Sequence, residues 1–130
     1  ECKKVLEESG GNLAKARELL KQRGKQLALK KGAREVGEGI VAVYMHPTGK
    51  TAAMIDLRCE TDFVARSEDF KKLSHELALQ AASMDPESME ELLSPPYIRD
   101  PGKTIQDLIS ESIAKLGENI MIKRFSRFEI

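Results

Sequence analysis

The sequence predicts an α+β fold in which a three-stranded antiparallel sheet packs on helices and follows a partial helical module. Apolar residues recur at helical spacing near the N-terminus and again over residues 67–83. Between these helices the apolar period switches to two, and an alternating stretch at residues 119–130 supplies a third strand. We therefore expect a partial N-terminal helical module at 1–24, a linker at 25–37 and an α+β core domain at 38–130.

Composition excludes several classes of function. The chain has 130 residues, and its 21 Lys and Arg residues balance 21 Asp and Glu residues. A general nucleic-acid binder needs a basic surplus to displace counterions, so no direct nucleic-acid partner is expected. A membrane helix needs ~20 consecutive apolar residues, and the sequence holds no such run. Cys2 and Cys59 make neither a disulfide framework nor a metal cluster, as in a soluble protein of a reducing compartment.

The zero net charge hides a separation of charge along the chain. Residues 1–34 hold ten Lys or Arg against four Asp or Glu, whereas residues 60–93 hold three against nine. Two regions of opposite potential suit docking to a protein partner. The same pattern also fits solvated helix faces without a partner, and charge alone favours neither interpretation.

The N-terminal segment carries two short helical patterns. A first helix over about residues 1–8 precedes a glycine pair, and Asn12 caps a second helix that runs to about Gln22. Gly24 is expected just after that helix, as its C′ residue. Two helices this short cannot bury enough surface to fold alone, so we expect a further helix before the first residue. Residues 25–37 are basic and show no clean period, which predicts a linker.

Two alternating apolar stretches, residues 39–45 and 51–57, predict a β-hairpin with its turn at 46–50. The turn and the residue after it read HPTGKT, which ends like a phosphate-binding loop. Such a loop needs a glycine five places before Gly49, where Tyr44 stands, and a helix after the lysine. The hairpin turn is therefore the better interpretation.

A long amphipathic helix follows the hairpin. Ser67 is its expected N-cap, with two acidic residues in the first turn, and the helix runs to about Ser83. Its core stripe recurs at spacings of three and four and consists of Phe70, Leu73, Leu77, Ala81 and Met84.

The C-terminal third predicts another helix and the last strand. Residues 87–93 suit a short helix, and residues 94–97 form an extended connector because two prolines follow each other there. Thr104 caps a helix that Gly117 closes, and residues 119–130 form the final strand. The expected inward residues of that helix are Ile105, Leu108, Ile109, Ser112, Ile113 and Leu116.

Few side chains offer catalytic, metal or nucleic-acid chemistry. Cys59, His46 and His75 do not stand at metal-ligand spacing, and Cys59 suits a small buried hydrophobic residue in a strand. Phe125 and Phe128 lie beside basic residues, where exposed rings would stack on nucleic-acid bases. Rings packed in the core beside solvated basic side chains explain the same pattern.

The connection from the second strand to the long helix, residues 59–66, is unusual. It places Phe63 and Val64 next to Asp62, although such a connection is ordinarily polar. In one interpretation Phe63 and Val64 pack under the following helix as a hydrophobic staple. In the other, a projecting apolar wedge with an acidic neighbour enters a partner's pocket.

Four separated motifs, in order along the chain, resemble elongation factor Ts. Residues 59–66 read CETDFVAR and are similar to the signature of that family. The resemblance implies that the N-terminal segment is a partial module of the ubiquitin-associated type. The other matching motifs are CKKVL at 2–6 with GGNL at 10–13, EGIV at 38–41, and IAKLGENI at 113–120 with KRF at 123–125.

The resemblance implies a guanine nucleotide exchange factor that promotes GDP release from the GTPase elongation factor Tu. No covalent bond changes in that process, so neither an enzyme nor a cofactor is expected. Asp62 and Phe63 would intrude beside the partner's Mg²⁺ site, and Thr61, Val64 and Ala65 would set the turn that presents them. Four basic residues, Lys3, Lys4, Lys30 and Lys31, would dock on the partner. The expected location is the bacterial cytoplasm or an organellar matrix.

The chain departs from the family pattern in several places. The first helix of the module is absent, and Arg58 and Ser67 stand where the family usually has asparagine. The stretch before Thr104 is short beside long members, which carry a second core subdomain. Contacts made by those parts are therefore not carried over to this chain.

Other functions stay open. A protein-interaction module of the translation apparatus would bind its partner without changing nucleotide release. A translation-linked RNA binder would lose affinity steeply with salt, which the neutral total charge disfavours. The exposed edge of such a sheet would also allow two copies to pair as a homodimer.

Overall fold

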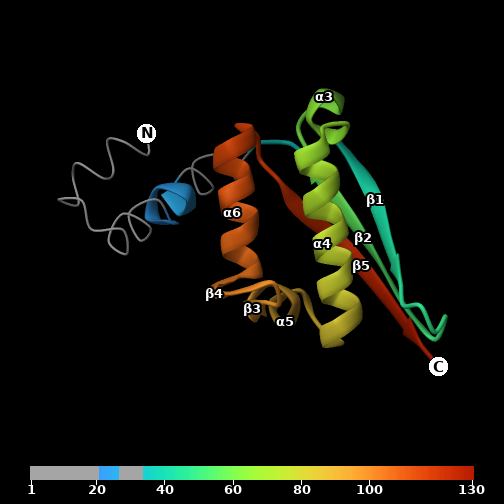
Figure 1. Ribbon diagram of the computed structural model, residues 1–130. Helices are drawn as coiled ribbons and strands as arrows, with labels where there is room; N and C mark the ends of the chain where they lie inside the picture. Colours follow the sequence, from blue (N-terminus) through green and yellow to red (C-terminus); the bar gives the residue numbers. More distant parts are fainter. Residues whose placement is uncertain (1–20, 27–33) are drawn as a thin grey trace.

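The computed structural model describes residues 21–26 and 34–130. Three strands, β1 (Glu38–Met45), β2 (Thr51–Cys59) and β5 (Met121–Glu129), form an antiparallel sheet in the order β1-β2-β5. Helix α4 (Glu68–Met84) lies across one face of this sheet, and α6 (Ile105–Leu116) lies beside α4 (Figure 1). The α+β fold expected from the sequence is confirmed.

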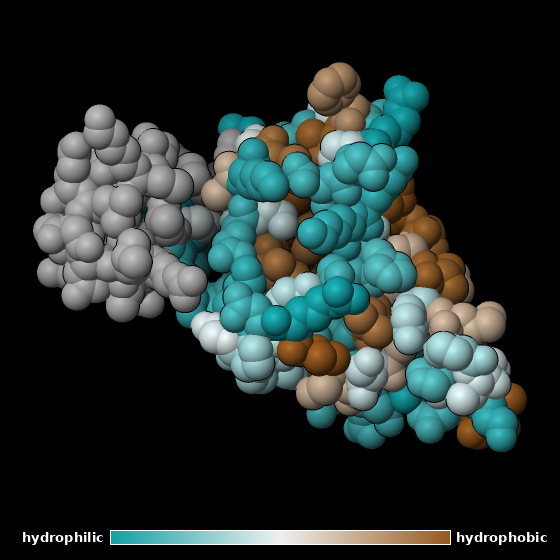
Figure 2. Space-filling model, viewed as in Figure 1, coloured by the Kyte–Doolittle hydropathy of each residue, from teal (hydrophilic) through white to brown (hydrophobic). Residues whose placement is uncertain are grey.

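The hydrophobic core lies between α4, α6 and the inner face of the sheet. Phe70 and Leu77 of α4 and Ile55 and Leu57 of β2 are fully buried in it. The outward surfaces of α4 and α6 are largely hydrophilic (Figure 2), as expected of helices that cover a core on one side only. None of the described helices is long and apolar enough to cross a membrane.

The hairpin of β1 and β2 forms as predicted. The amide of His46 donates a 2.8 Å hydrogen bond to the carbonyl of Thr51 and closes the turn. Gly49 within the turn has a φ of 71°, a conformation that glycine adopts without strain. The glycine-lysine pair therefore serves a hairpin and not a phosphate loop.

Helix α4 begins at the predicted N-cap, where Ser67 Oγ accepts a hydrogen bond from the amide of Phe70. The predicted stripe is buried from Phe70 to Ala81, but Met84 is 46% exposed, so its assignment to the core was wrong. Met84 is the last residue of the helix, and the chain turns away at Asp85, which has a φ of 51°.

Three small elements connect the large ones. A helical turn, α3 (Asp62–Ala65), joins β2 to α4, and α5 (Met89–Leu93) follows α4. Of the expected extended connector at 94–97, only Pro96 and Tyr97 form a strand, whereas Ser94 keeps a helical conformation as the C-cap of α5. The two strand residues pair in a small hairpin that the sequence did not predict. Its strands are β3 (Pro96–Tyr97) and β4 (Asp100–Thr104).

Helix α6 has the predicted ends. Thr104 and Asp107 form a reciprocal capping box, and Gly117 ends the helix with a φ of 77°. Three of the six expected inward residues are fully packed, and the other three are half-buried at the margin of the core. The buried ones are Ile105, Ile109 and Ile113, and the half-buried ones are Leu108, Ser112 and Leu116.

Residues 21–26 are helical, so helical structure is present beyond the end predicted at Gln22. Gly24 lies inside this helix and is not its C′ residue. A Cβ atom at Gly24 would lie 3.6 Å from the carbonyl oxygen of Ser110, which indicates a close approach to α6. Residues 1–20 of the module and 27–33 of the linker lie outside the described residues, and residues 34–37 form neither helix nor strand. The predicted domain boundaries therefore stay a prediction.

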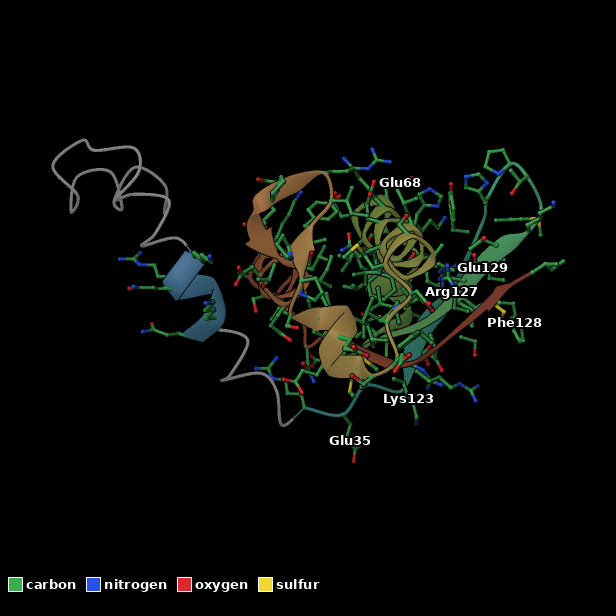
Figure 3. All side chains as sticks on the ribbon, turned by 90° about the horizontal axis from the view of Figure 1, so that it is seen from below. Glu35, Glu68, Lys123, Arg127, Phe128 and Glu129 are labelled. Carbon is green, nitrogen blue, oxygen red and sulfur yellow. The ribbon has the colours of Figure 1, made fainter. Side chains whose placement is uncertain are left out.

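The sheet has an inner face toward α4 and an open face. In β5, Arg127 lies on the side of α4, where its Nε donates to the carbonyl of Ala82, and Phe128 lies on the opposite side (Figure 3). Phe125 pairs with Ile55 and packs against the core, as expected. Phe128 pairs with Ala52 and is 74% exposed, so its assignment to the core was wrong. Residues at odd spacing point to opposite faces of a strand, which is why one ring is inside and the other outside.

Candidate functional site

The unusual connection after β2 forms one helical turn, α3. Thr61 is its N-cap, and the Thr61 hydroxyl accepts a 3.3 Å hydrogen bond from the amide of Val64. The carbonyl of Thr61 accepts from Ala65 at 3.1 Å, and that of Asp62 accepts from Arg66 at 3.1 Å. A threonine at the N-cap and an acidic residue after it are typical of a helix start, so the local sequence favours this turn.

The turn exposes one apolar side chain and buries the next. Phe63 is 85% exposed, whereas Val64 is 8% exposed and Ala65 is buried in the core. Hydrophobic surface protrudes at the end of the molecule where α3 lies (Figure 2). The staple interpretation therefore holds for Val64 alone, and Phe63 projects as the wedge interpretation requires. Since Val64 and Ala65 are buried, they hold the turn in place from within this chain.

Asp62 is also exposed, and its carboxylate is paired within the turn. Arg66 Nη2 lies 2.9 Å from Asp62 Oδ2, one helical turn away. The acidic neighbour of Phe63 is therefore partly neutralised in the free chain. Sequence reasoning missed Arg66, although its spacing of four residues from Asp62 is the signal of such a pair.

Both ends of the turn are tied to the core domain. Ser67 Oγ donates a 2.7 Å hydrogen bond to the carbonyl of Val64 and also caps α4, so only Arg66 and Ser67 separate the turn from the helix. On the other side, Glu118 accepts hydrogen bonds from Glu60 and Thr61. Sequence reasoning missed Glu118, because this contact joins segments more than fifty residues apart.

Cys59 is packed beneath the turn. Its thiol is fully buried and donates to the carbonyl of Thr61 at 3.2 Å. Burial raises the pKa of the Cys59 thiol to about 11, with a further contribution from Glu118. A protonated, buried thiol is a poor nucleophile, which agrees with its interpretation as a small core residue.

The other predicted site residues are Lys3, Lys4, Lys30 and Lys31, and all four lie outside the described residues. Within residues 21–26 and 34–130, no three His, Cys, Asp or Glu side chains gather where they could hold a metal ion. The feature that stands out at α3 is thus an exposed aromatic ring on a rigid turn. Such a ring is suited to contact a partner protein.

A small α+β domain that presents an exposed Asp-Phe turn has the features of a protein-interaction domain. Comparison with known proteins identifies its family. The family described as Elongation factor TS matches residues 60–130. The chain is 40% identical to elongation factor Ts of Coprothermobacter proteolyticus, over all of this chain and 89% of that protein. The chain belongs to the elongation factor Ts family, whose members are translation elongation factors.

The relatives differ in length. The alignment with the Coprothermobacter proteolyticus protein runs over 175 positions, against 130 residues in this chain, so that relative has residues that this chain lacks. Elongation factor Ts of Aquifex aeolicus is 43% identical over 99% of this chain but only 46% of its own length. Elongation factor Ts of Nostoc sp. is 44% identical over all of this chain and 41% of its own length. This chain therefore spans less than half the length of the latter two relatives.

Proposed function

We propose that this chain binds elongation factor Tu and promotes the release of GDP from it, without itself changing any covalent bond. The observation that carries the proposal is the 85% exposure of Phe63 on a turn whose two neighbouring residues, Val64 and Ala65, are buried. An exposed phenylalanine is unfavourable in water, and its burial in a partner's pocket recovers about 2 kcal/mol or more. The rigid turn adds little entropic cost to binding.

An exchange factor must bind the nucleotide-free partner better than the GDP-bound form. The exchange factor and GDP then weaken each other's binding to the partner by the same factor. A 1,000-fold faster release of GDP requires roughly 4 kcal/mol of such competing interaction. Insertion of Phe63 supplies about half of that. Other contacts, among them those of Lys3, Lys4, Lys30 and Lys31, supply the rest through the opposite charge of the partner surface.

Asp62 acts beside the wedge in this proposal. Its carboxylate is 59% exposed and leaves Arg66 at modest cost, because exposed ion pairs contribute about 0–1 kcal/mol. Next to a bound Mg²⁺ the freed carboxylate disturbs the coordination shell of the ion. Loss of the ion then weakens the hold on GDP. The corresponding site of action is the bacterial cytoplasm or an organellar matrix, where translation takes place.

The proposal is tested by the release of fluorescent GDP from elongation factor Tu. The wild-type chain is expected to accelerate release, and Phe63→Ala is expected to lower the stimulated rate roughly 30-fold, which corresponds to about 2 kcal/mol. Ile98→Ala is the matched control, because Ile98 is an exposed apolar residue of the small hairpin away from α3. Equal stimulation by Phe63→Ala and the wild type would contradict the role of the ring.

The same assay separates the alternatives. A pure interaction module would bind elongation factor Tu, with no change in the rate of GDP release. An RNA binder would show affinity for RNA that falls steeply between low and moderate salt. The exposed Asp-Phe turn favours the exchange factor over both.

We further propose that two copies pair as a homodimer. The proposed interface is the open face of the sheet and not the sheet edges. This face carries Asp56 with Arg58 Nε at 2.6 Å and Arg124 Nε at 3.2 Å. A second copy presents the same mixture of apolar and paired charged groups, as a two-fold interface requires. The exposed apolar side chains of the face are Val41, Val43, Met45, Met54, Met121 and Phe128.

Sedimentation analysis at several protein concentrations tests the homodimer. The wild type is expected to sediment as a dimer and Val43→Lys as a monomer, because a buried unpaired lysine is costly. A wild type that remains monomeric at all concentrations would contradict this proposal.

A further inference from the structure

Glu118 holds the start of the exposed turn, although it lies 57 residues away from Thr61 in the sequence. It follows Gly117, the residue that ends α6, and its carboxylate reaches the residues between β2 and α3. Glu118 Oε1 accepts hydrogen bonds from the amides of Glu60 at 3.1 Å and Thr61 at 3.0 Å. Glu118 Oε2 accepts a 2.7 Å hydrogen bond from the hydroxyl of Thr61. One side chain therefore satisfies three donors at the base of the turn.

The contact is reciprocal. Glu60 Oε2 accepts a 2.5 Å hydrogen bond from the amide of Asn119. Asn119 Nδ2 in turn donates to the carbonyl of Arg34 at 3.0 Å, and Arg34 Nη1 lies 3.7 Å from Glu60 Oε1. Each of two neighbouring glutamates thus binds the backbone of the other segment. The two segments cannot slide or separate without breaking several hydrogen bonds at once.

The hydroxyl of Thr61 connects this clamp to the turn. It donates its single proton to Glu118 and accepts from the amide of Val64, which is the capping bond of α3. A hydroxyl has one donor, so the bond to Glu118 leaves its lone pairs available for the Val64 amide. Phe63 lies between Thr61 and Val64 in the sequence, and its own side chain is almost fully exposed. The direction of its ring is therefore set by the backbone that Thr61 and Val64 hold.

We propose that Glu118 is a positioning residue for Phe63: through Thr61 it fixes the turn in the orientation from which the ring enters the partner. The proposal rests on the exchange function proposed above. Glu118 does not contact the partner in this scheme. It acts by keeping the turn from sampling other orientations, because each such orientation lowers the fraction of molecules that are competent to insert the ring.

The positioning role of Glu118 can be separated from a purely structural one, in which its loss would destabilise the fold. Glu118 is only half-buried, and Thr61 is exposed, so water can replace the lost hydrogen bonds in a variant. The variant Glu118→Ala is therefore expected to fold and to retain the core. What changes is the order of the turn and not the packing of α4 on the sheet.

The first part of the test compares Glu118→Ala with Glu118→Gln in the GDP-release assay. Glutamine keeps one oxygen for the two amides and can donate its NH₂ group to the Thr61 hydroxyl, so it retains the clamp. We expect the stimulated rate to fall roughly tenfold in Glu118→Ala and to stay within about twofold of the wild type in Glu118→Gln. The double variant Phe63→Ala/Glu118→Ala should be no slower than Phe63→Ala alone. Losses that multiply in the double variant would overturn the proposal.

The second part needs no partner. Hydrogen exchange of the amides of Glu60, Thr61 and Val64 is expected to speed up in Glu118→Ala, while the amide of Leu57 in β2 stays protected as in the wild type. Unchanged exchange at all three turn amides would overturn the positioning role. If the wild-type chain does not accelerate GDP release at all, the exchange function fails. The amide measurement then still decides whether Glu118 orders the turn.

Discussion

Lys21 Nζ lies 3.1 Å from Asp107 Oδ2, and this pair joins the N-terminal helical residues to the first turn of α6. Lys25 Nζ lies 3.5 Å from the other oxygen of the same carboxylate. Asp107 is 5% exposed and also accepts a hydrogen bond from the amide of Thr104. Burial opposes its ionisation, but the Thr104 amide and the two lysines outweigh burial and lower the pKa of Asp107.

Asp107 should make the free energy of unfolding depend on pH in the acidic range. Because its pKa is lowered on folding from the usual 3.8, the charged carboxylate stabilises the fold above about pH 5, and this contribution is lost as the pH falls below 3.8 and through the lowered pKa of the folded state. We expect Asp107→Asn to lower the free energy of unfolding by about 1 kcal/mol at pH 7 and by less at pH 3. Urea unfolding of both proteins across this range measures the difference. A difference that stays constant with pH would contradict the prediction.

Adjacent substitutions in the turn should differ in stability. Phe63→Ala removes an exposed ring and should change the free energy of unfolding by less than about 0.5 kcal/mol. Val64→Ala removes two buried methyl groups and should cost about 2 kcal/mol. Thermal and urea unfolding of the two variants test this. A large loss of stability in Phe63→Ala would mean that the ring packs within this chain.

Cys59 should be unreactive in the folded protein. A pKa of about 11 leaves about a hundredfold less thiolate at pH 8 than the usual value of 9.0, and the sulfur is also buried. In a Cys2→Ser background, alkylation by iodoacetamide should be at least ~100-fold slower in the native protein than in urea. Mass spectrometry follows the modification. Similar rates in both states would show that the base of the turn opens readily.

Gly39 should tolerate no side chain. A Cβ atom there would lie 2.1 Å from the carbonyl oxygen of Leu57 in the neighbouring strand, a distance that forces the backbone to move. Gly39→Ala is expected to cost about 2 kcal/mol or more of unfolding free energy. Gly37→Ala is the matched control, because nothing lies within 4 Å of its Cβ position, and it should cost less than about 0.5 kcal/mol. Equal stability of the two variants would contradict the close approach of the strands.

Short-range features sufficed to predict the three strands of the main sheet and the helices α4, α5 and α6. The caps at Ser67 and Thr104 and the glycine after α6 lie where the sequence indicated, because capping depends on hydrogen bonds within one helical turn. The hairpin followed from an apolar period of two and turn residues between the strands. The signature around Asp62 and Phe63 likewise pointed to the family from the chain alone.

Packing between distant segments determined the rest. Neighbouring residues on a turn point in different directions, but only the contact with the sheet selects Val64 for burial and leaves Phe63 exposed. The carboxylate of Glu118 meets Thr61 across a separation of 57 residues, and no local pattern contains that information. The same holds for the exposed ring of Phe128, whose face depends on the register of β5 against β2. Periods and caps arise from the backbone within a few residues, whereas these contacts arise only when remote elements come together.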